Sequence, residues 1–229
     1  MRNASLAHRL PGVSLRAPMN TTSTTRSVAW IAGVGASAGL GAALARRFAL
    51  GGLSVALTGR TLERLETLAA EIRSLGGRAH VLPADMAQEA QVRSLAADLA
   101  GLGPLRAAIF NAAPFDDARG SRPSAAALFA RTAVSALLAH DADIDSGGTR
   151  GSVLFRDDTS EGGLNALARR LAGEHDPQGI HVGRVVVDRR ADGPLTPDEI
   201  AAACWRLHAQ RRGAWTFELD MQAGGKAAA

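Results

Sequence analysis

Several residue types are missing or nearly missing from the sequence, and each absence excludes a class of structure or chemistry. The chain contains no tyrosine, and of its 26 basic residues only Lys226 is a lysine. Its single cysteine, Cys204, cannot form a disulfide within the chain, and no cluster of histidines beside it predicts a zinc site. We therefore expect a protein of the reducing cytoplasm, with Cys204 buried on the apolar face of a helix.

Long apolar runs and clustered charge are also missing. No uninterrupted apolar run reaches the roughly 18 residues that a membrane-spanning helix needs. The formal net charge is +4, but the arginines are scattered, and acidic residues lie among them after position 62. Scattered charge of both signs indicates a solvated surface instead of a basic groove. The sequence predicts neither a membrane segment nor a nucleic-acid partner.

The two ends of the chain differ in composition from its middle. Residues 1–27 contain no acidic residue and are rich in serine, threonine and arginine. This composition predicts a disordered basic arm, with a transit-like peptide as the alternative. Residues 223–229, which end in GGKAAA, are predicted to be a disordered tail. Residues 28–222 then form one domain.

Within that domain, strand-like and helix-like segments alternate, as in a parallel sheet covered by helices. Strands are predicted at residues 28–32, 54–60, 78–85, 105–113, 151–155, 181–188 and 215–220. Helices are predicted at residues 39–50, 61–76, 88–103, 124–142, 159–175 and 196–210. The pattern predicts the α/β class, as a single doubly wound Rossmann-type domain with a parallel sheet of about seven strands and helices on both faces.

A glycine-rich loop follows the first predicted strand. The stretch AWIAGVGASAGLGAALARRFALGG places Gly35, Gly39 and Gly41 between a strand and a helix. Such glycines let the backbone turn tightly and approach a pyrophosphate, whose charge is stabilised by free N–H groups and by the positive end of the helix dipole. The loop predicts a dinucleotide site.

Four motifs resemble those of the short-chain dehydrogenases/reductases, and the resemblance runs from Val28 to about Asp220. The loop VGASAGLG (34–41) resembles the family's T-G-x-x-x-G-x-G, with Val34 in place of threonine. Asp85 lies where the family has an aspartate near the adenine ring, and Asn111 in FNAAP resembles the family's N-N-A-G. PQGIHV (177–182) resembles the segment that leads into the sixth strand.

The resemblance implies a nicotinamide dinucleotide as cofactor and a small carbonyl or alcohol as substrate. Family members of this fold commonly form homodimers or homotetramers through their fourth and fifth helices, and a heteromer with an active relative is the alternative. The implied cofactor-binding residues are Gly35, Ser37, Ala38, Gly39, Leu40, Gly41, Arg60, Asp85, Met86, Asn111 and Ala112.

Cofactor choice is predicted from the end of the second strand. An acidic residue there would accept hydrogen bonds from the adenosine ribose, whereas an arginine would pair with a 2′-phosphate. The segment LTGR offers Arg60 and no acid. The sequence therefore favours NADP(H) over NAD(H), with an ordinary surface arginine as the alternative.

The family's catalytic residues have no counterpart in this chain. Members of the family use a tyrosine, a lysine four residues later, a serine and an asparagine, and a chain without tyrosine cannot supply the first. Alignment from the GIHV motif places Asp157 at the tyrosine position and Glu161 at the lysine position, with Ser135 near the asparagine position. About a dozen residues before Asp157, which would contain the serine, are missing.

The acidic stretch FRDDTSEGG then has three interpretations. Asp157 and Glu161 could act as unorthodox acid–base groups, or the acids could bind Mg²⁺. The favoured interpretation is that Asp158 and Glu161 form a capping box at the start of the next helix, and we predict no metal site.

Two hypotheses for function remain open. The chain is either an NADP(H)-binding oxidoreductase with impaired or altered catalysis, or a catalytically inactive protein that binds the cofactor or partners an active subunit. Fold-level analogy does not decide between them.

Overall fold

A computed structural model describes residues 27–111, 125–139, 148–158, 163–187 and 195–221. The predicted arm, apart from Ser27, and the predicted tail at 223–229 lie outside these residues. The same is true of two predicted site residues, Ala112 and Glu161.

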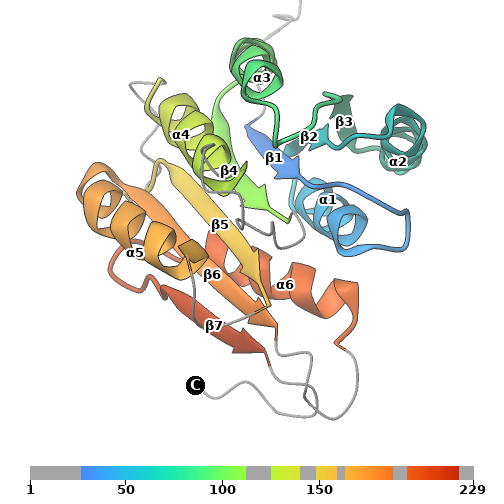
Figure 1. Cartoon of the computed structure of the whole chain (residues 1–229). Helices are drawn as coiled ribbons and strands as arrows, with labels where there is room; N and C mark the ends of the chain where they lie inside the picture. The colour runs from blue at the N-terminus through green and yellow to red at the C-terminus, as the bar shows by residue number, and fades with distance from the viewer. Residues whose placement is uncertain (1–26, 112–124, 140–147, 159–162, 188–194, 222–229) are drawn as a thin grey trace, which may run out of the picture.

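Seven strands form one parallel sheet in the order β3-β2-β1-β4-β5-β6-β7 (Figure 1). From β1 the chain builds outward to β2 and β3, and it then returns to the other side of β1 through β4. The strand order therefore reverses between β1 and β4, which is where dinucleotides bind in such folds. The strands are β1 Val28–Ala32, β2 Ser54–Thr58, β3 Arg78–Val81, β4 Leu105–Phe110, β5 Gly151–Asp157, β6 Ile180–Val187 and β7 Glu218–Met221.

Six α-helices cover the two faces of the sheet over the described ranges (Figure 1). The side chains of α1, α2 and α6 pack into one apolar core, and those of α3, α4 and α5 into a second core on the opposite face. The fold class is thus the predicted one. The helices are α1 Leu40–Leu50, α2 Leu62–Ser74, α3 Glu89–Leu102, α4 Ala125–Leu138, α5 Gly163–His175 and α6 Pro197–His208.

The central strand and the last helix show how local sequence fixes the elements. β1 is buried along its whole length, which explains its continuous apolar run VAWIA. α6 begins with a capping box, in which the Thr196 hydroxyl accepts from the Glu199 amide and the Glu199 carboxylate accepts from the Thr196 amide. On the buried face of this helix, the apolar surroundings of Cys204 raise the pKa of its thiol to about 12, as expected for an inert core residue.

The predicted elements are all present, but some of their ends differ. β5 extends two residues further than predicted, to Asp157. The last strand begins at Glu218 instead of residue 215, because the Thr216 amide donates to the Gln210 side chain and not to a neighbouring strand. The PQGIHV motif forms a short 3₁₀ helix, Asp176–Gln178, that ends at Gly179 with φ +80°, a conformation that favours glycine.

Candidate cofactor site

The glycine loop lies between the end of β1 and the start of α1. The amides of Gly33 and Val34 both donate to the Thr58 carbonyl, at 2.9 Å each, which fixes the loop against the end of β2. Gly39 occupies the N-cap of α1 without a side-chain cap, and the first turn of the helix contains no acidic residue. Among the described residues, the positive end of this helix dipole is therefore neutralised neither by a side-chain cap nor by an acid in the first turn.

Two of the loop glycines differ in what surrounds them. A Cβ atom at Gly41 would lie 2.8 Å from the Val34 Cα and 2.9 Å from the Gly33 carbonyl oxygen, so packing of helix against loop requires glycine there. A Cβ atom at Gly35 would meet nothing within 4 Å. Packing thus does not explain the glycine at position 35, whereas close approach of a ligand to the backbone would.

Asn111, at the end of β4, joins the same loop. Its amide donates to the Ala32 carbonyl at 2.9 Å, and its side-chain Nδ2 donates to the Gly33 carbonyl at 3.2 Å. The ends of β1 and β4 are held together by these bonds at the point where the strand order reverses. Ala112, the neighbouring predicted site residue, lies outside the described residues.

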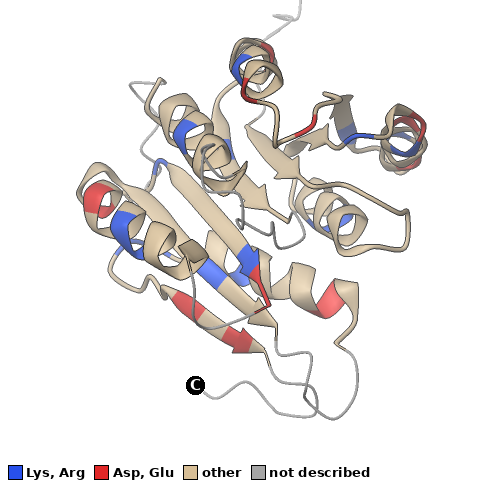
Figure 2. Cartoon of the chain, viewed as in Figure 1, with Lys and Arg blue, Asp and Glu red and all other residues tan. Residues whose placement is uncertain are grey.

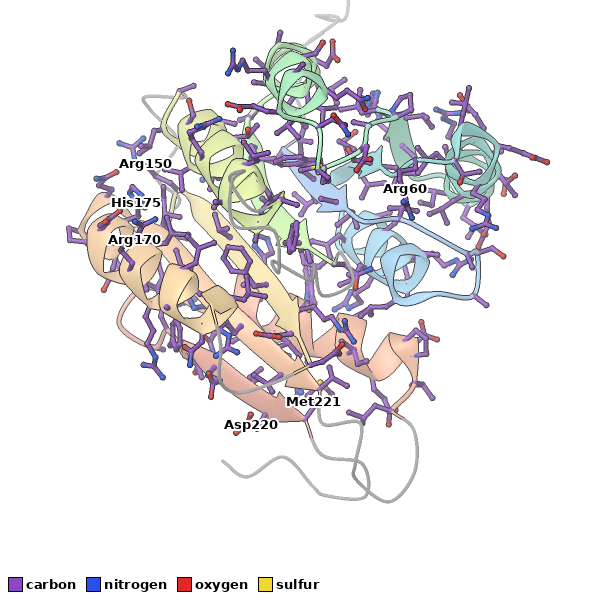
Figure 3. The ribbon with its side chains drawn as sticks, in the orientation of Figure 1. Arg60, Arg150, Arg170, His175, Asp220 and Met221 are labelled. Atoms are coloured by element: carbon purple, nitrogen blue, oxygen red, sulfur yellow. The ribbon has the colours of Figure 1, made fainter. Side chains whose placement is uncertain are left out.

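Arg60 follows the end of β2, in the part of the molecule formed by β2, α1 and α2 (Figure 3). Its side chain is exposed, and within the described residues it has no hydrogen-bond or ion-pair partner. The preceding Gly59 is packed so closely that a Cβ atom would lie 2.3 Å from the Val34 carbonyl oxygen. This packing places Arg60 directly beside the glycine loop.

Asp85 and Met86 lie between β3 and α3. The Asp85 carboxylate accepts from the Ala87 amide at 3.0 Å, and the Asp85 amide donates to the Gln91 side chain at 2.8 Å. Ala84 is tied to the end of β2 by a bond from its amide to the Gly59 carbonyl. The Met86 side chain is buried in the core beneath α3, so only its backbone remains for a ligand.

Arg46 braces the loop from outside. Its guanidinium donates to the Ser37 carbonyl at 3.1 Å and to both oxygens of Glu71 on α2, at 2.6 and 2.9 Å. The hydrogen bond from Arg46 lowers the pKa of the Glu71 carboxyl. This bidentate pair links α1, α2 and the exposed backbone of the loop.

The described part of the acidic stretch, Asp157 and Asp158, lies at the end of β5 beside two arginines. The Asp157 carboxylate accepts from the Arg184 Nη2 at 2.8 Å and from the Asp158 amide at 2.8 Å, and Asp158 is paired with Arg156. Arg184 also donates to Glu218 on β7 at 2.6 Å. The predicted capping box is not tested, because Glu161 lies outside the described residues. What the structure adds is that both aspartates are in ion pairs.

The remaining catalytic candidate, Ser135, lies on the exposed side of α4. Arg184 was not singled out from the sequence, although an arginine inside the apolar run HVGRVVV was a visible signal.

Among the described residues, no group of three histidine, cysteine, aspartate or glutamate side chains could hold a metal ion. Within the same ranges, none of the helices is both long and apolar enough to cross a membrane.

Comparison with known proteins gives a family match in the first half of the chain. The family model described as short chain dehydrogenase matches residues 29–136. A protein described as an uncharacterized oxidoreductase, from Mycobacterium tuberculosis, is 42% identical over 82 residues, which are 34% of this chain and 24% of that protein. The human dehydrogenase/reductase SDR family member 1 is 43% identical over 61 residues, or 27% of this chain and 20% of the relative. The matched part is thus about a quarter of the curated relatives' length or less.

Solved structures extend the similarity to most of the chain. A short-chain dehydrogenase from Rhodopseudomonas palustris is 26% identical, with a TM-score of 0.69 over 86% of this chain and 98% of the other. A metagenomic short-chain oxidoreductase, solved in complex with NADP, is 24% identical, with a TM-score of 0.71 over 87% of this chain and 98% of the other. The chain thus shares the seven-stranded fold of these short-chain dehydrogenases, and its match to the family model covers residues 29–136.

Proposed function

We propose that the chain binds a nicotinamide dinucleotide at the ends of β1, β2 and β4, with NADP(H) preferred over NAD(H), and that its oxidoreductase catalysis is impaired or altered. The observation that carries the proposal is the glycine loop with an uncapped helix start and an exposed Arg60 beside it. The loop amides and the helix dipole would stabilise the pyrophosphate, and the Arg60 guanidinium would pair with a 2′-phosphate. Asn111 would hold the loop in place from β4.

The altered catalysis follows from the composition. A bound nicotinamide cofactor accepts or supplies a hydride, and the protein must supply the matching proton transfer. The chain has no tyrosine, and its lysine lies at position 226. Asp157 and Asp158 are each in an ion pair with an arginine, and a role of either carboxylate in catalysis would have to break that pair. This engagement favours the second candidate function, a catalytically inactive cofactor-binding protein.

Calorimetric titration of the full chain with NADPH, NADP⁺, NADH and NAD⁺ tests the proposal. A charge-assisted contact from Arg60 to the 2′-phosphate should make NADPH bind about 10- to 100-fold tighter than NADH. Arg60→Gln should remove that preference and leave NADH affinity unchanged. Arg211→Gln is the matched control, because Arg211 is an exposed arginine that follows α6 and precedes β7, at the opposite edge of the sheet. Failure of all four nucleotides to bind at millimolar concentration would refute the proposal.

Turnover is tested by a screen of carbonyl and alcohol substrates with the bound cofactor. If the acids act in catalysis, turnover should be found and should be lost in Asp157→Asn with Glu161→Gln, in a variant whose circular dichroism still matches the parent protein. Absence of turnover with tight cofactor binding supports the inactive candidate.

For assembly we propose a homodimer or homotetramer through α4 and α5, or a heteromer with an active relative. Light scattering after gel filtration distinguishes these assemblies from a monomer.

A further inference from the structure

Two leucines at the carboxyl ends of neighbouring helices are exposed to solvent. Leu50, the last residue of α1, is 78% exposed, and Leu75, directly after α2, is 72% exposed. The two helix ends are in contact, because a Cβ atom at Gly77 would lie 3.6 Å from the Ala49 Cβ. Apolar side chains that gather at one place on a surface are typical of an interaction site, whereas a single exposed leucine needs no explanation.

Trp205, on α6, extends this apolar surface on the other side of α1. Its ring packs so closely against the turn after α1 that a Cβ atom at Gly51 would lie 2.0 Å from it. The ring is only partly buried, and the Arg47 guanidinium lies over it at 4.5 Å. α1 thus lies between α2 and α6 (Figure 1), and its only charged residues are two arginines (Figure 2). We call Leu50, Leu75 and Trp205 the α1 patch.

The amino-terminal segment, residues 1–26, is attached to the domain close to this patch. The Ser27 carbonyl accepts from the Ser54 amide at 3.0 Å, and Ser54 follows Leu50 by four residues. The attachment point therefore lies at the amino ends of β1 and β2, where α1 ends. The glycine loop follows the carboxyl end of β1, so the α1 patch and the proposed cofactor site lie at opposite ends of the sheet.

The composition of the amino-terminal segment fits an apolar surface. Residues 20–26, NTTSTTR, are polar, and seven extended residues span up to about 25 Å, whereas the four residues from Leu50 to Ser54 span at most about 14 Å. This polar stretch is therefore long enough to bring the preceding residues onto the patch. A segment with few apolar residues cannot bury a core of its own, so its apolar side chains can be buried only against the domain or a partner. Beyond Met1, its leucine, valine and methionine residues are Leu6, Leu10, Val13, Leu15 and Met19.

We infer that the amino-terminal segment docks on the α1 patch through the apolar side chains of residues 6–19, and thus covers the end of the domain opposite the cofactor site. The inference goes beyond the proposed function, because no proposed cofactor-binding residue belongs to the patch. The chain's own segment is favoured over a second copy because a short tether gives an effective concentration on the order of millimolar, whereas a second copy must associate from solution.

Limited proteolysis of the full chain tests the inference. Trypsin cleaves after Arg9 and Arg16, and a docked segment is cleaved only in the fraction of molecules that have released it. Mass spectrometry should show cleavage at these two arginines at least about tenfold slower in the full chain than in a synthetic peptide of residues 1–26. Leu50→Ser combined with Leu75→Ser should restore the cleavage rate of the free peptide.

Leu62→Ser is the matched control, because Leu62 is also an exposed leucine but begins α2, at the other end of the helix from Leu75. It should leave the protection of the segment unchanged. All three substitutions replace exposed side chains, so the circular dichroism of the variants should match that of the parent protein.

Protein concentration separates the possible occupants of the α1 patch. Protection by the chain's own segment should be the same at about 1 and about 50 µM protein. Protection that grew with concentration would identify a second copy as the occupant and overturn the inference. Cleavage of the full chain at the rate of the free peptide would also overturn it, and so would protection that persisted in the Leu50→Ser, Leu75→Ser variant.

Discussion

Around the ends of β1, β2 and β4, the chain presents an exposed loop, an uncapped helix start and an arginine without a partner among the described residues. Around β5, β6 and β7, the buried Arg184 is paired with the partly buried Asp157 and Glu218 on the two adjacent strands. Both regions belong to one continuous parallel sheet. The first region thus leaves an arginine without a partner among the described residues, whereas the second pairs its central arginine with two acidic residues of the chain.

The two regions also differ in how far the match to the family model reaches. The family model matches residues 29–136, a range that contains the whole glycine loop and Asn111 but ends before β5. Structural similarity nevertheless covers 86% of the chain. Burial of apolar strands and helices maintains the sheet in both regions, so the architecture does not depend on the residues that would react with a substrate.

The largest expected effect comes from removing Arg184, whose ion pairs join β5, β6 and β7. Arg184→Leu leaves Asp157 and Glu218 partly buried without their shared partner, and it should lower the free energy of unfolding by about 3–5 kcal/mol. Urea denaturation followed by circular dichroism measures the loss. The NADPH affinity, measured where the variant is still folded, should be retained, because the proposed cofactor-binding residues lie at the ends of β1, β2 and β4.

The control for Arg184→Leu neutralises the acids at the same time. Arg184→Leu combined with Asp157→Asn and Glu218→Gln removes the unpaired charges and should recover most of the lost stability. If Arg184→Leu alone stayed within about 1 kcal/mol of the parent protein, the ion pairs of Arg184 would not be a major source of stability.

Two glycines of the loop separate packing from binding within the first region. Gly41→Ala would bring a methyl group to 2.8 Å from backbone, so unfolding free energy should fall by about 1–3 kcal/mol. Gly35→Val should change stability by less than about 0.5 kcal/mol, since the space is open and the φ of Gly35 is not positive. Its branched side chain would nevertheless weaken NADPH binding at least about tenfold by blocking approach to the loop.

Calorimetry and urea denaturation on the same two variants check this contrast. The expected pattern is a destabilised Gly41→Ala and a stable Gly35→Val that binds poorly. If Gly35→Val bound NADPH like the parent protein, the pyrophosphate would not approach the loop at Gly35. That result would contradict the proposed binding mode.

The fold was largely predictable because its signals are local. Alternating apolar strands and helices, the glycines after β1 and the PQG segment before β6 are all visible within short stretches, and the structure confirms seven parallel strands. The ion pairs of Arg184 with Asp157 and Glu218 could not be predicted from such short stretches. Arg184 meets Asp157 across 27 residues and Glu218 across 34, so pairing depends on strand register, which the sequence does not specify one residue at a time.

The same reasoning explains what was missed in the site. Asp157 was aligned with a catalytic position by counting residues, and such a count could not reveal its ion pair with Arg184 on the neighbouring strand. The brace from Arg46 to Glu71 was not predicted either, because it joins helices 25 residues apart. Because this ion pair is partly exposed, its removal is expected to have the smallest effect of the variants considered.

Glu71→Gln tests whether the Arg46–Glu71 ion pair holds the glycine loop in the geometry that binds the cofactor. The pair is partly exposed, so its contribution is modest, and NADPH affinity should fall about two- to fivefold with little change in stability. Glu66→Gln is the control, because Glu66 lies on the same helix, is more exposed and pairs with Arg73 at 3.9 Å, away from the loop. It should bind NADPH like the parent protein.

The pH dependence of this effect has a defined sign. Because Arg46 lowers the pKa of Glu71 below its ordinary value of 4.5, the pair's contribution is fully present at neutral pH and is lost as the pH falls through the lowered pKa. The affinity difference between the parent protein and Glu71→Gln should therefore be constant from pH 8 to about pH 6 and should shrink only in stronger acid. A difference that disappeared already near neutral pH would mean that another group, and not the Glu71 carboxylate, orients the loop.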